Sequence, residues 1–425
     1  MSVMDIVQRI RSLEKQGIKP GLGRISALLG RMGHPERSYR SVVVGGTNGK
    51  GSTCAMMDSM LRSAGQRTGL YTSPHLVHMR ERIRTNGAMI DEGSLEDTAR
   101  AIFDMVQDDP AISGTTYFEF LTALALQHFK DRHVDIAVLE VGMGGRFDAT
   151  NAVEPMVSTV TNIAMDHEAY LGGTPEEIAG EKAGIIRRGR PFVTTDTCPG
   201  SRAVLEIECR QRGGMLYAVD RDFSVCGDES DMDFRSPGRT IEGMKLSLRG
   251  RHQLYNAGAA IQSLLLLEKE GIGVTDGQIR EGLLRTVWHG RFETIHGHPD
   301  VVVDSAHNPA GIRTLVQAVK DNYSGRATIV FAASSDKDWK TMISMLREIS
   351  DTFVFTSYRG ERSADPGTFR DFTGTGVPGG GCRAHVVERA DGALKYALDI
   401  TPPDGVIVVA GSIFLVGELK TEACL

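Results

Sequence analysis

The chain has 425 residues, of which 41% are hydrophobic and 24% are charged, and its formal net charge is −6. These values are ordinary for a globular protein, and at roughly 150 residues per domain the length predicts two or three domains. The acidic balance argues against a nucleic-acid-binding protein, which would carry a basic face. No apolar run approaches the roughly 20 residues that cross a membrane.

The six cysteines are scattered along the chain without a C-x-x-C pair, and the first 16 residues lack the apolar core of a signal peptide. This pattern favours neither a zinc site nor a disulfide framework. We therefore expect a protein of the reducing cytoplasm.

A glycine-rich stretch near the N-terminus predicts a phosphate-binding loop. The β-branched run Val42–Val44 leads into Gly45, and a helical pattern follows from Lys50 to Ala64. Glycines let backbone N–H groups converge, and the start of a helix carries partial positive charge, so a polyphosphate fits between strand and helix. The candidate residues of this loop are Gly46, Thr47, Asn48, Gly49, Lys50, Gly51, Ser52 and Thr53.

The loop departs from the common G-x-x-x-x-G-K-[ST] pattern, because Val44 stands at the first glycine position and Gly51 follows Lys50. The alternative is a glycine-rich turn with a solvated lysine. The flanking strand and helix favour phosphate binding, with Lys50 reaching the terminal phosphates and Ser52 or Thr53 facing a metal ion.

The next elements continue an alternation of strands and helices. We predict a short strand at 68–71, a long loop over the site at 72–87, and helices at 91–107 and 117–130. The nearly continuous apolar run 134–141 is typical of a buried parallel strand. The glycine run that follows is not a dinucleotide fingerprint, because Phe147 takes the place of its third glycine and no helix follows.

A further strand is expected at 156–160, and a helix with Thr174 as N-cap, Pro175 at its first position and Glu177 placed for a capping box. Lys182 is expected in the first turns of that helix, where the helix dipole disfavours a cation. Alternating helices and strands then run to about residue 248, before a long helix from 252 to 270.

Near residues 288–291 the pattern restarts. Apolar strands at 301–304, 327–332 and 406–410 alternate with helices, one of which begins at Pro309. The sequence therefore predicts an α/β protein with a first domain over 1–288, a smaller second domain over 292–425, and a hinge at about 288–291.

Polar residues follow four of the predicted strands of the first domain, at Gly45–Ser52, Ser73, Glu140 and Asp166–His167. Ligands of open parallel sheets bind beyond the carboxyl ends of the strands, so these residues predict one crevice. A buried Glu140 needs a cation, either a Mg²⁺ ion on the phosphates or a neighbouring basic side chain. His167 is either a ligand or a hydrogen-bonded core histidine. Asp304–Pro309 lies at the corresponding edge of the second domain, or is an ordinary turn.

In this order, these blocks resemble the folylpolyglutamate synthase/dihydrofolate synthase family, relatives of the Mur peptide ligases, over essentially the whole chain. The motifs that carry the resemblance are Gly46–Ser52, Tyr71–Leu76, Leu139–Asn151, Thr161–Ile163 with Asp166–His167, Gly180–Ile185, Gly290–Glu293 and Asp304–Pro309.

The resemblance implies a Mur-ligase-like P-loop ATPase domain with a mostly parallel sheet, followed by a smaller Rossmann-like α/β C-terminal domain. It implies an ATP-dependent ligase of folate biosynthesis and one-carbon metabolism. A substrate carboxylate would attack the γ-phosphate of ATP to give an acyl phosphate, and the amino group of L-glutamate would then displace phosphate. The substrate would be dihydropteroate, a folate, or both, and the chain is expected to act as a monomer.

The resemblance also assigns roles to single residues. Lys50 would bind the ATP phosphates, and Ser73, Glu140 and His167 would be Mg²⁺ ligands, with two metal sites expected. Lys182 would be N-carboxylated (carbamylated), which would turn a misplaced cation into an anion. The residues matching ATP contacts are Asn256, Arg291, Asp304 and His307.

On the substrate side, Ser412 is a candidate for the glutamate site, while Asp148 is expected near the pterin and could assist the incoming amine. Thr116 and Phe118 match positions that hold dihydropteroate, although Phe118 also fits a place in the helix core. Ser305 stands where many members carry glycine.

Two rival functions share part of this pattern. Another Mur-type amide ligase, acting on a UDP-sugar peptide or a cyanophycin-like polymer, would use the same ATP machinery; the UDP-sugar enzymes should carry an additional N-terminal domain, and only about forty residues precede the loop. The other rival is a P-loop regulatory ATPase. In such a protein Lys182, Asp304 and His307 would have no evident function.

Overall fold

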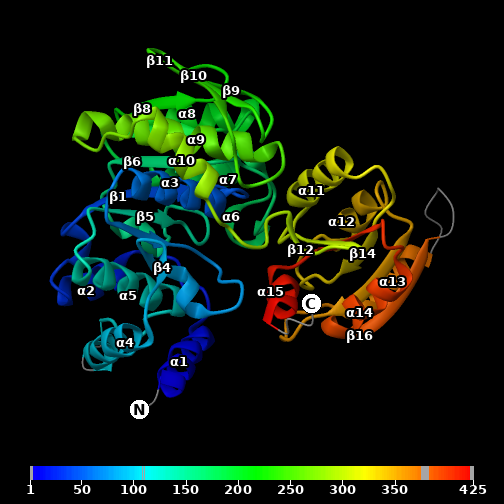
Figure 1. Ribbon diagram of the computed structural model, residues 1–425. Helices are drawn as coiled ribbons and strands as arrows, with labels where there is room; N and C mark the ends of the chain where they lie inside the picture. Colours follow the sequence, from blue (N-terminus) through cyan, green and yellow to red (C-terminus); the bar gives the residue numbers. More distant parts are fainter. Residues whose placement is uncertain (1–2, 108, 110, 375–381, 422–425) are drawn as a thin grey trace. The chain divides into compact units, whose positions relative to one another are not determined.

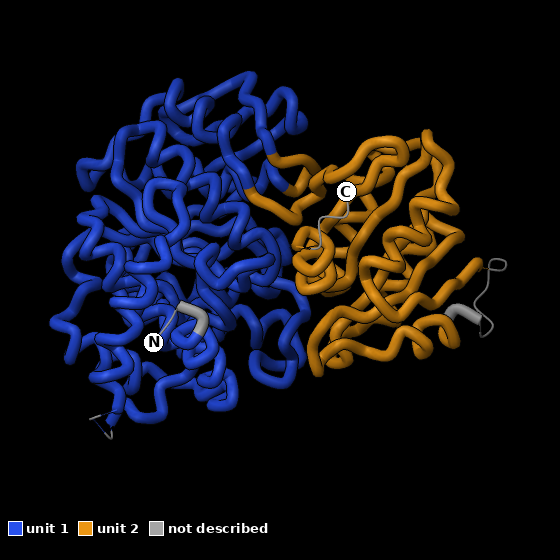
Figure 2. The backbone as a smooth tube through the Cα atoms, turned by 60° about the horizontal axis from the view of Figure 1, so that its bottom comes forward, with its two compact units in different colours: residues 1–247, 253–287 blue, residues 248–252, 288–425 orange. Residues whose placement is uncertain are grey.

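The computed structural model describes residues 3–107, 109, 111–374 and 382–421 (Figure 1). The chain divides into two compact units (Figure 2), residues 1–247 with 253–287 and residues 248–252 with 288–425. The short segment 248–252, which the sequence analysis assigns to the first domain, belongs to the second unit. There Arg249 lies over the ring of Phe292 at 5.3 Å.

Unit 1 is built on an eight-stranded sheet in the order β4-β3-β2-β5-β1-β6-β7-β8. The strands from β2 to β8 in this order are parallel, and β3 runs antiparallel to both of its neighbours, β2 and β4. Their bounds are β1 Arg40–Gly45, β2 Thr68–Tyr71, β3 Ile83–Thr85, β4 Ala88–Met89, β5 Ile136–Glu140, β6 Val157–Val160, β7 Pro191–Thr194 and β8 Met215–Ala218.

Helices cover both faces of this sheet, and Figure 1 shows α3, α9 and α10 on one side and α2 and α5 on the other. Apolar residues of α1, α2, α4 and α5 form a continuous core with the sheet. The helices of unit 1 are α1 Val3–Ser12, α2 Gly23–Arg31, α3 Lys50–Ser63, α4 Glu92–Gln107, α5 Tyr117–Asp131, α6 Glu168–Leu171, α7 Pro175–Lys182, α8 Pro199–Gln211, α9 His252–Leu267, whose first residue belongs to unit 2, and α10 Asp276–Arg285.

Two segments of unit 1 differ from the sequence prediction. The stretch 72–87, predicted as a long loop, contains a 3₁₀ helix at Met79–Arg82 and strand β3, which pairs with β2. The stretch 220–248, predicted to continue the alternation, forms a separate antiparallel sheet of β9 Ser224–Gly227, β10 Met232–Ser236 and β11 Arg239–Met244. Short strands with charged residues give little hydrophobic pattern, so both were missed.

Unit 2 has a six-stranded sheet in the order β12-β13-β17-β14-β15-β16, parallel except for β12. The strands are β12 Glu293–His296, β13 Asp300–Val303, β14 Thr328–Phe331, β15 Thr352–Ser357, β16 Arg383–Arg389 and β17 Val406–Ala410. The helices are α11 Pro309–Asn322, α12 Trp339–Leu346, α13 Pro366–Gly374, α14 Ala390–Ile400 and α15 Ile413–Thr421. The predicted α/β class and the mostly parallel sheets are confirmed.

Candidate active site

The central strands of unit 1 place the predicted crevice residues at one edge of the sheet. β2, β5, β1 and β6 are consecutive in the sheet order and parallel, with Tyr71 opposite Leu139, Val44 opposite Glu140 and Gly45 opposite Val160. Four connections therefore leave the same edge of the sheet. They are the loop with Ser73, the segment after Glu140, the phosphate loop, and the segment with Asp166–His167.

The phosphate loop adopts a backbone that only glycine fits at two positions. Gly46 has φ +135°, and a Cβ there would lie 1.9 Å from Thr161 Oγ1. Gly49, which precedes α3, has φ +82°, and a Cβ there would lie 2.3 Å from Asn256 Oδ1. The loop is thus closely packed between the end of β6 and helix α9, with Asn256 buried against it.

The segment after β6 holds the phosphate loop through hydrogen bonds. The amides of Thr47 and Asn48 donate to the backbone and side-chain oxygens of Asn162, at 2.8 and 2.9 Å. Thr161 Oγ1 donates to the Asn48 carbonyl at 2.6 Å, and Thr47 Oγ1 exchanges hydrogen bonds with the backbone of Ala164. Sequence reasoning gave Thr161 and Asn162 no role, although their place directly after a buried strand was the available signal.

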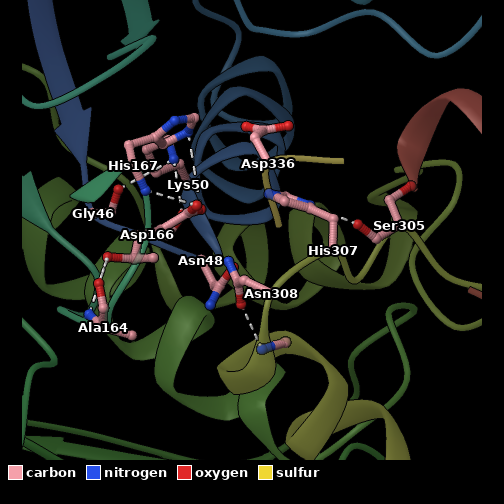
Figure 3. A network of polar contacts seen from close by, with 12 residues as sticks. Gly46, Asn48, Lys50, Ala164, Asp166, His167, Ser305, His307, Asn308 and Asp336 are labelled. Carbon is pink, nitrogen blue, oxygen red and sulfur yellow. Dashed lines mark hydrogen bonds and ion pairs between the residues drawn. The ribbon is translucent and has the colours of Figure 1, made fainter. Parts of the chain in front are cut away.

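Two lysines meet at the carbonyl of Gly46. Lys50 Nζ donates to the carbonyls of Gly46 and Thr47 at 3.1 and 2.9 Å, and Lys182 Nζ donates to the Gly46 carbonyl at 2.9 Å. Figure 3 shows Lys50 turned back toward Gly46. Both side-chain nitrogens therefore lie at the loop that the sequence assigns to phosphate.

The sequence placement of Lys182 on its helix is wrong. Helix α7 is eight residues long and Lys182 is its last residue, where the dipole favours a cation rather than opposing it. The side chain is nevertheless 3% exposed, and this burial, with the nearby charge of Lys50, lowers its pKa to about 7. Burial therefore favours the neutral amine form of Lys182.

Gly145 and Gly184 allow the backbone around Lys182 to pack closely against the segment after β5. A Cβ on Gly145 would lie 2.9 Å from the carbonyl oxygens of Glu181 and Lys182, and one on Gly184 would lie 2.3 Å from Arg146 Cα. The Arg146 amide donates to the Glu181 carbonyl at 2.9 Å. The glycine run after β5 is therefore a packing surface for the end of α7.

The predicted helix cap holds in part. Thr174 accepts the Glu177 amide as N-cap, but the Glu177 carboxylate accepts the amide of Gly173, not that of Thr174, so no capping box forms.

The candidate metal ligands lie at the end of β5 and on two neighbouring loops. Glu140 is 4% exposed, and its Oε2 accepts the Ser73 amide at 2.9 Å. His167 has φ +52°, its amide donates to Asp166 Oδ1 at 2.9 Å, and its Nε2 lies 3.9 Å from Asp166 Oδ2 (Figure 3). In the described part of the chain no three or more His, Cys, Asp or Glu side chains are grouped to hold a metal. A buried carboxylate beside a phosphate loop nevertheless fits an ion bound partly through phosphates.

The three candidate pterin residues of unit 1 make structural contacts. Asp148 accepts the amides of Met143 and Thr150, both at 3.0 Å, and burial raises its pKa. Thr116 caps α5 by accepting the Glu119 amide. Phe118 is half-buried, with its ring across Gly142 and 5.9 Å from the ring of Tyr71.

In unit 2, the predicted residues gather after β13. Asp304 accepts the amides of Phe292 and Ala306, both at 2.8 Å; burial raises its pKa, and the nearby charge of Arg291 opposes that rise. His307 Nδ1 lies 2.9 Å from the Ser305 carbonyl oxygen (Figure 3). Ser412 is buried and its Oγ accepts the Phe414 amide at the start of α15.

Comparison with known proteins places both units in one superfamily. The Mur ligase middle domain matches residues 44–264, and the Mur ligase glutamate ligase domain matches residues 290–413. The described residues contain no helix long and apolar enough to cross a membrane.

Similar proteins cover the whole chain. A dihydrofolate synthase/folylpolyglutamate synthase of Bacillus subtilis is 34% identical over 96% of this chain and 95% of its own. The structure of Escherichia coli FolC in complex with DHPP and ADP has a TM-score of 0.90 and 29% identity, over 98% of this chain and 97% of that one. A bifunctional folylpolyglutamate synthase/dihydrofolate synthase with Mn, AMPPNP and L-glutamate bound has a TM-score of 0.89 and 30% identity, over 99% and 98%.

Proposed function

The chain belongs to the folylpolyglutamate synthase/dihydrofolate synthase family of Mur ligases, and we propose that it adds L-glutamate to dihydropteroate, to folates, or to both, with ATP as the energy source. The observation that supports this most strongly is the Gly45–Ser52 loop, with Lys50 and Lys182 converging on one of its carbonyls. The protein is an ATP-dependent ligase. The pterin and glutamate substrates of the proposal are taken from the names of its relatives.

In the proposed reaction, an oxygen of the substrate carboxylate attacks the γ-phosphorus of ATP, and ADP leaves. The glutamate amine then attacks the resulting acyl phosphate, and the C–O bond to phosphate breaks as the amide forms. Backbone amides of residues 46–52 and the start of α3 would hold the phosphates, and Lys50 would leave its loop carbonyls for them. A Mg²⁺ ion held by Ser73, Glu140 and His167 would supply charge neutralisation of the phosphates when bound.

We propose that Lys182 is N-carboxylated and helps to hold a second metal site. Carbamylation needs a neutral amine: the nitrogen bonds to the carbon of CO₂ and one proton is released. Burial brings the pKa of Lys182 to about 7, so the reactive form is available near neutral pH. The product carbamate is an anion, which would be attracted to the neighbouring charge of Lys50.

The remaining assignments rest on the family motifs. Asn256, Arg291, Asp304 and His307 are proposed to contact ATP. Ser412 is proposed for the glutamate site, with Phe118, Thr116 and Asp148 for the pterin. Since Asp148 and Thr116 already accept backbone amides, we propose that they shape the pterin site through the loops they hold.

We propose that the enzyme acts as a monomer in the cytoplasm. One chain carries both Mur ligase domains, and its five described cysteines are free thiols, two of them buried. Free thiols are normal in a reducing compartment.

The test uses purified protein, MgATP and L-glutamate, with dihydropteroate in one reaction and tetrahydrofolate in another, and mass spectrometry of the products. Addition of glutamate in both means a bifunctional enzyme, and addition in the second alone means a dedicated polyglutamate synthase. ATP consumption without glutamate addition in either would contradict the proposal and favour a regulatory ATPase.

A further inference from the structure

The turn that carries Arg291 has an unusual backbone. Gly290 has φ +70°, and Phe292, which is not a glycine, has φ +44°. A bulky residue in the left-handed region persists only where surrounding contacts hold it. The Phe292 side chain is 2% exposed and packs in the core of unit 2, and this packing helps to hold the backbone in that conformation.

Two carboxylates hold the amides on either side of Arg291. Glu293 Oε2 accepts the Gly290 amide at 2.7 Å, and Asp304 Oδ2 accepts the Phe292 amide at 2.8 Å. The Gly290 carbonyl accepts the Ser305 amide at 2.9 Å. The backbone before and after Arg291 is thus tied to fixed groups, which limits the directions that the Arg291 side chain can take.

The last described helix supports this turn from the other end of the sequence. Lys420, in α15, donates from Nζ to Glu293 Oε1 at 2.6 Å, and His289 Nδ1 lies 2.8 Å from the same oxygen. The side chains of Lys420 and Glu293 are 20% and 24% exposed, so this ion pair is partly shielded from water. Burial alone would raise the pKa of Glu293, but the hydrogen bonds from His289, Lys420 and Gly290 lower it to about 2.

We infer that Glu293 and Lys420 are positioning residues for Arg291: Lys420 fixes the Glu293 carboxylate, the carboxylate fixes the Gly290 amide, and the turn then presents the guanidinium to the nucleotide. This inference rests on the proposed nucleotide role of Arg291. It differs from a purely structural role of the ion pair, because it requires the effect of Lys420 on catalysis to pass through Arg291.

A double-mutant cycle separates the two roles. The full-length variants Lys420→Met, Arg291→Ala and the double variant are compared with wild type for kcat and KM for ATP in the glutamate-addition assay. Lys420→Met should lower kcat/KM for ATP about tenfold, since a small misorientation of a catalytic group costs about that much or more. In the Arg291→Ala background the same change should cost less than about twofold. Lys395→Met, an exposed lysine of α14, is the control for loss of a surface charge.

Two further variants guard against simple unfolding. Lys420→Arg keeps a cation on Glu293 and should recover most of the activity, and Glu293→Gln keeps an acceptor for the Gly290 amide but loses the pairing charge, so it should resemble Lys420→Met. If the losses of kcat/KM multiply in the double variant, or if the Lys420→Met variant behaves like the Lys395→Met control, the positioning role of Lys420 is overturned while the nucleotide role of Arg291 stands. Full turnover in Arg291→Ala would instead overturn the nucleotide role of Arg291, and the inference with it.

Discussion

Lys182→Met should strongly lower the ligation rate while making unit 1 more stable near neutral pH. Methionine has a similar length to lysine but no charge to bury. The Lys182 amine has a pKa of about 7 in the folded protein against an ordinary 10.5, a difference that corresponds to about 5 kcal/mol. Loss of the proposed carbamate and of the lysine charge should lower ligation at least about 100-fold.

The sign of the pH effect follows from which state binds the proton. Between pH 7 and 10.5 the unfolded chain holds a proton on Lys182 that the folded chain has released, so stability rises with pH in this window. The cost of burying Lys182 is therefore full below pH 7, about 4 kcal/mol at pH 7 and about 2 kcal/mol at pH 9. After subtracting about 1 kcal/mol for the lost hydrogen bond to Gly46, the variant should be more stable by about 3 kcal/mol at pH 7 and about 1 kcal/mol at pH 9.

Urea unfolding of wild type and Lys182→Met in CO₂-free buffer, in which Lys182 is a free amine, measures this gap at pH 7 and pH 9. Both tryptophans, Trp288 and Trp339, lie in unit 2, so their fluorescence follows that unit alone. Far-UV circular dichroism reports both units, and its difference from the fluorescence transition follows unit 1. Lys269→Met, at an exposed lysine of unit 1, is the matched control and should show no pH-dependent gap. A gap that is equal at both pH values, or a variant less stable than wild type at pH 7, would refute the description of Lys182 as a desolvated amine.

Three further predictions concern the same site. With ¹³C-bicarbonate, wild type should show a carbamate carbon signal by NMR that Lys182→Met lacks, and identical spectra would exclude carbamylation of Lys182. Gly49→Ala should raise KM for ATP at least about tenfold, because its Cβ would meet Asn256 Oδ1 at 2.3 Å. The control Gly271→Ala has a similar φ of +84°, but a Cβ there would have no atom within 4 Å, so an equal effect on KM in both variants would show that backbone strain, not the contact, matters. Glu140→Gln should need about tenfold more Mg²⁺ for half-maximal activity, and an unchanged Mg²⁺ requirement would remove Glu140 from the metal site.

The sequence predicted the elements whose pattern is local. The strand at 68–71 matches β2, Pro309 begins α11, and Thr174 and Pro175 begin α7 as expected. Parallel strands with polar residues after them also predicted that Ser73, Glu140 and the phosphate loop share one edge of the sheet, and the register bears this out.

What the sequence did not reveal depends on contacts between distant segments. A cap marks where a helix begins but not where it ends, so Lys182 was placed in the first turns of α7 and not at its last residue. The support of the phosphate loop by Thr161 and Asn162 joins residues more than one hundred positions apart. The link from Lys420 to the Arg291 turn spans an even larger part of the chain, and no periodic pattern encodes it.

The central claim is that phosphate leaves from an acyl phosphate of the substrate and not from water attack on ATP. The most direct test supplies the pterin or folate substrate with ¹⁸O in its reacting carboxylate, together with MgATP and L-glutamate, and measures the mass of the phosphate released. Ligation through an acyl phosphate transfers one ¹⁸O atom from the carboxylate to each phosphate formed. Phosphate without ¹⁸O, while ATP is consumed, would mean that water attacks ATP and would contradict the proposed reaction.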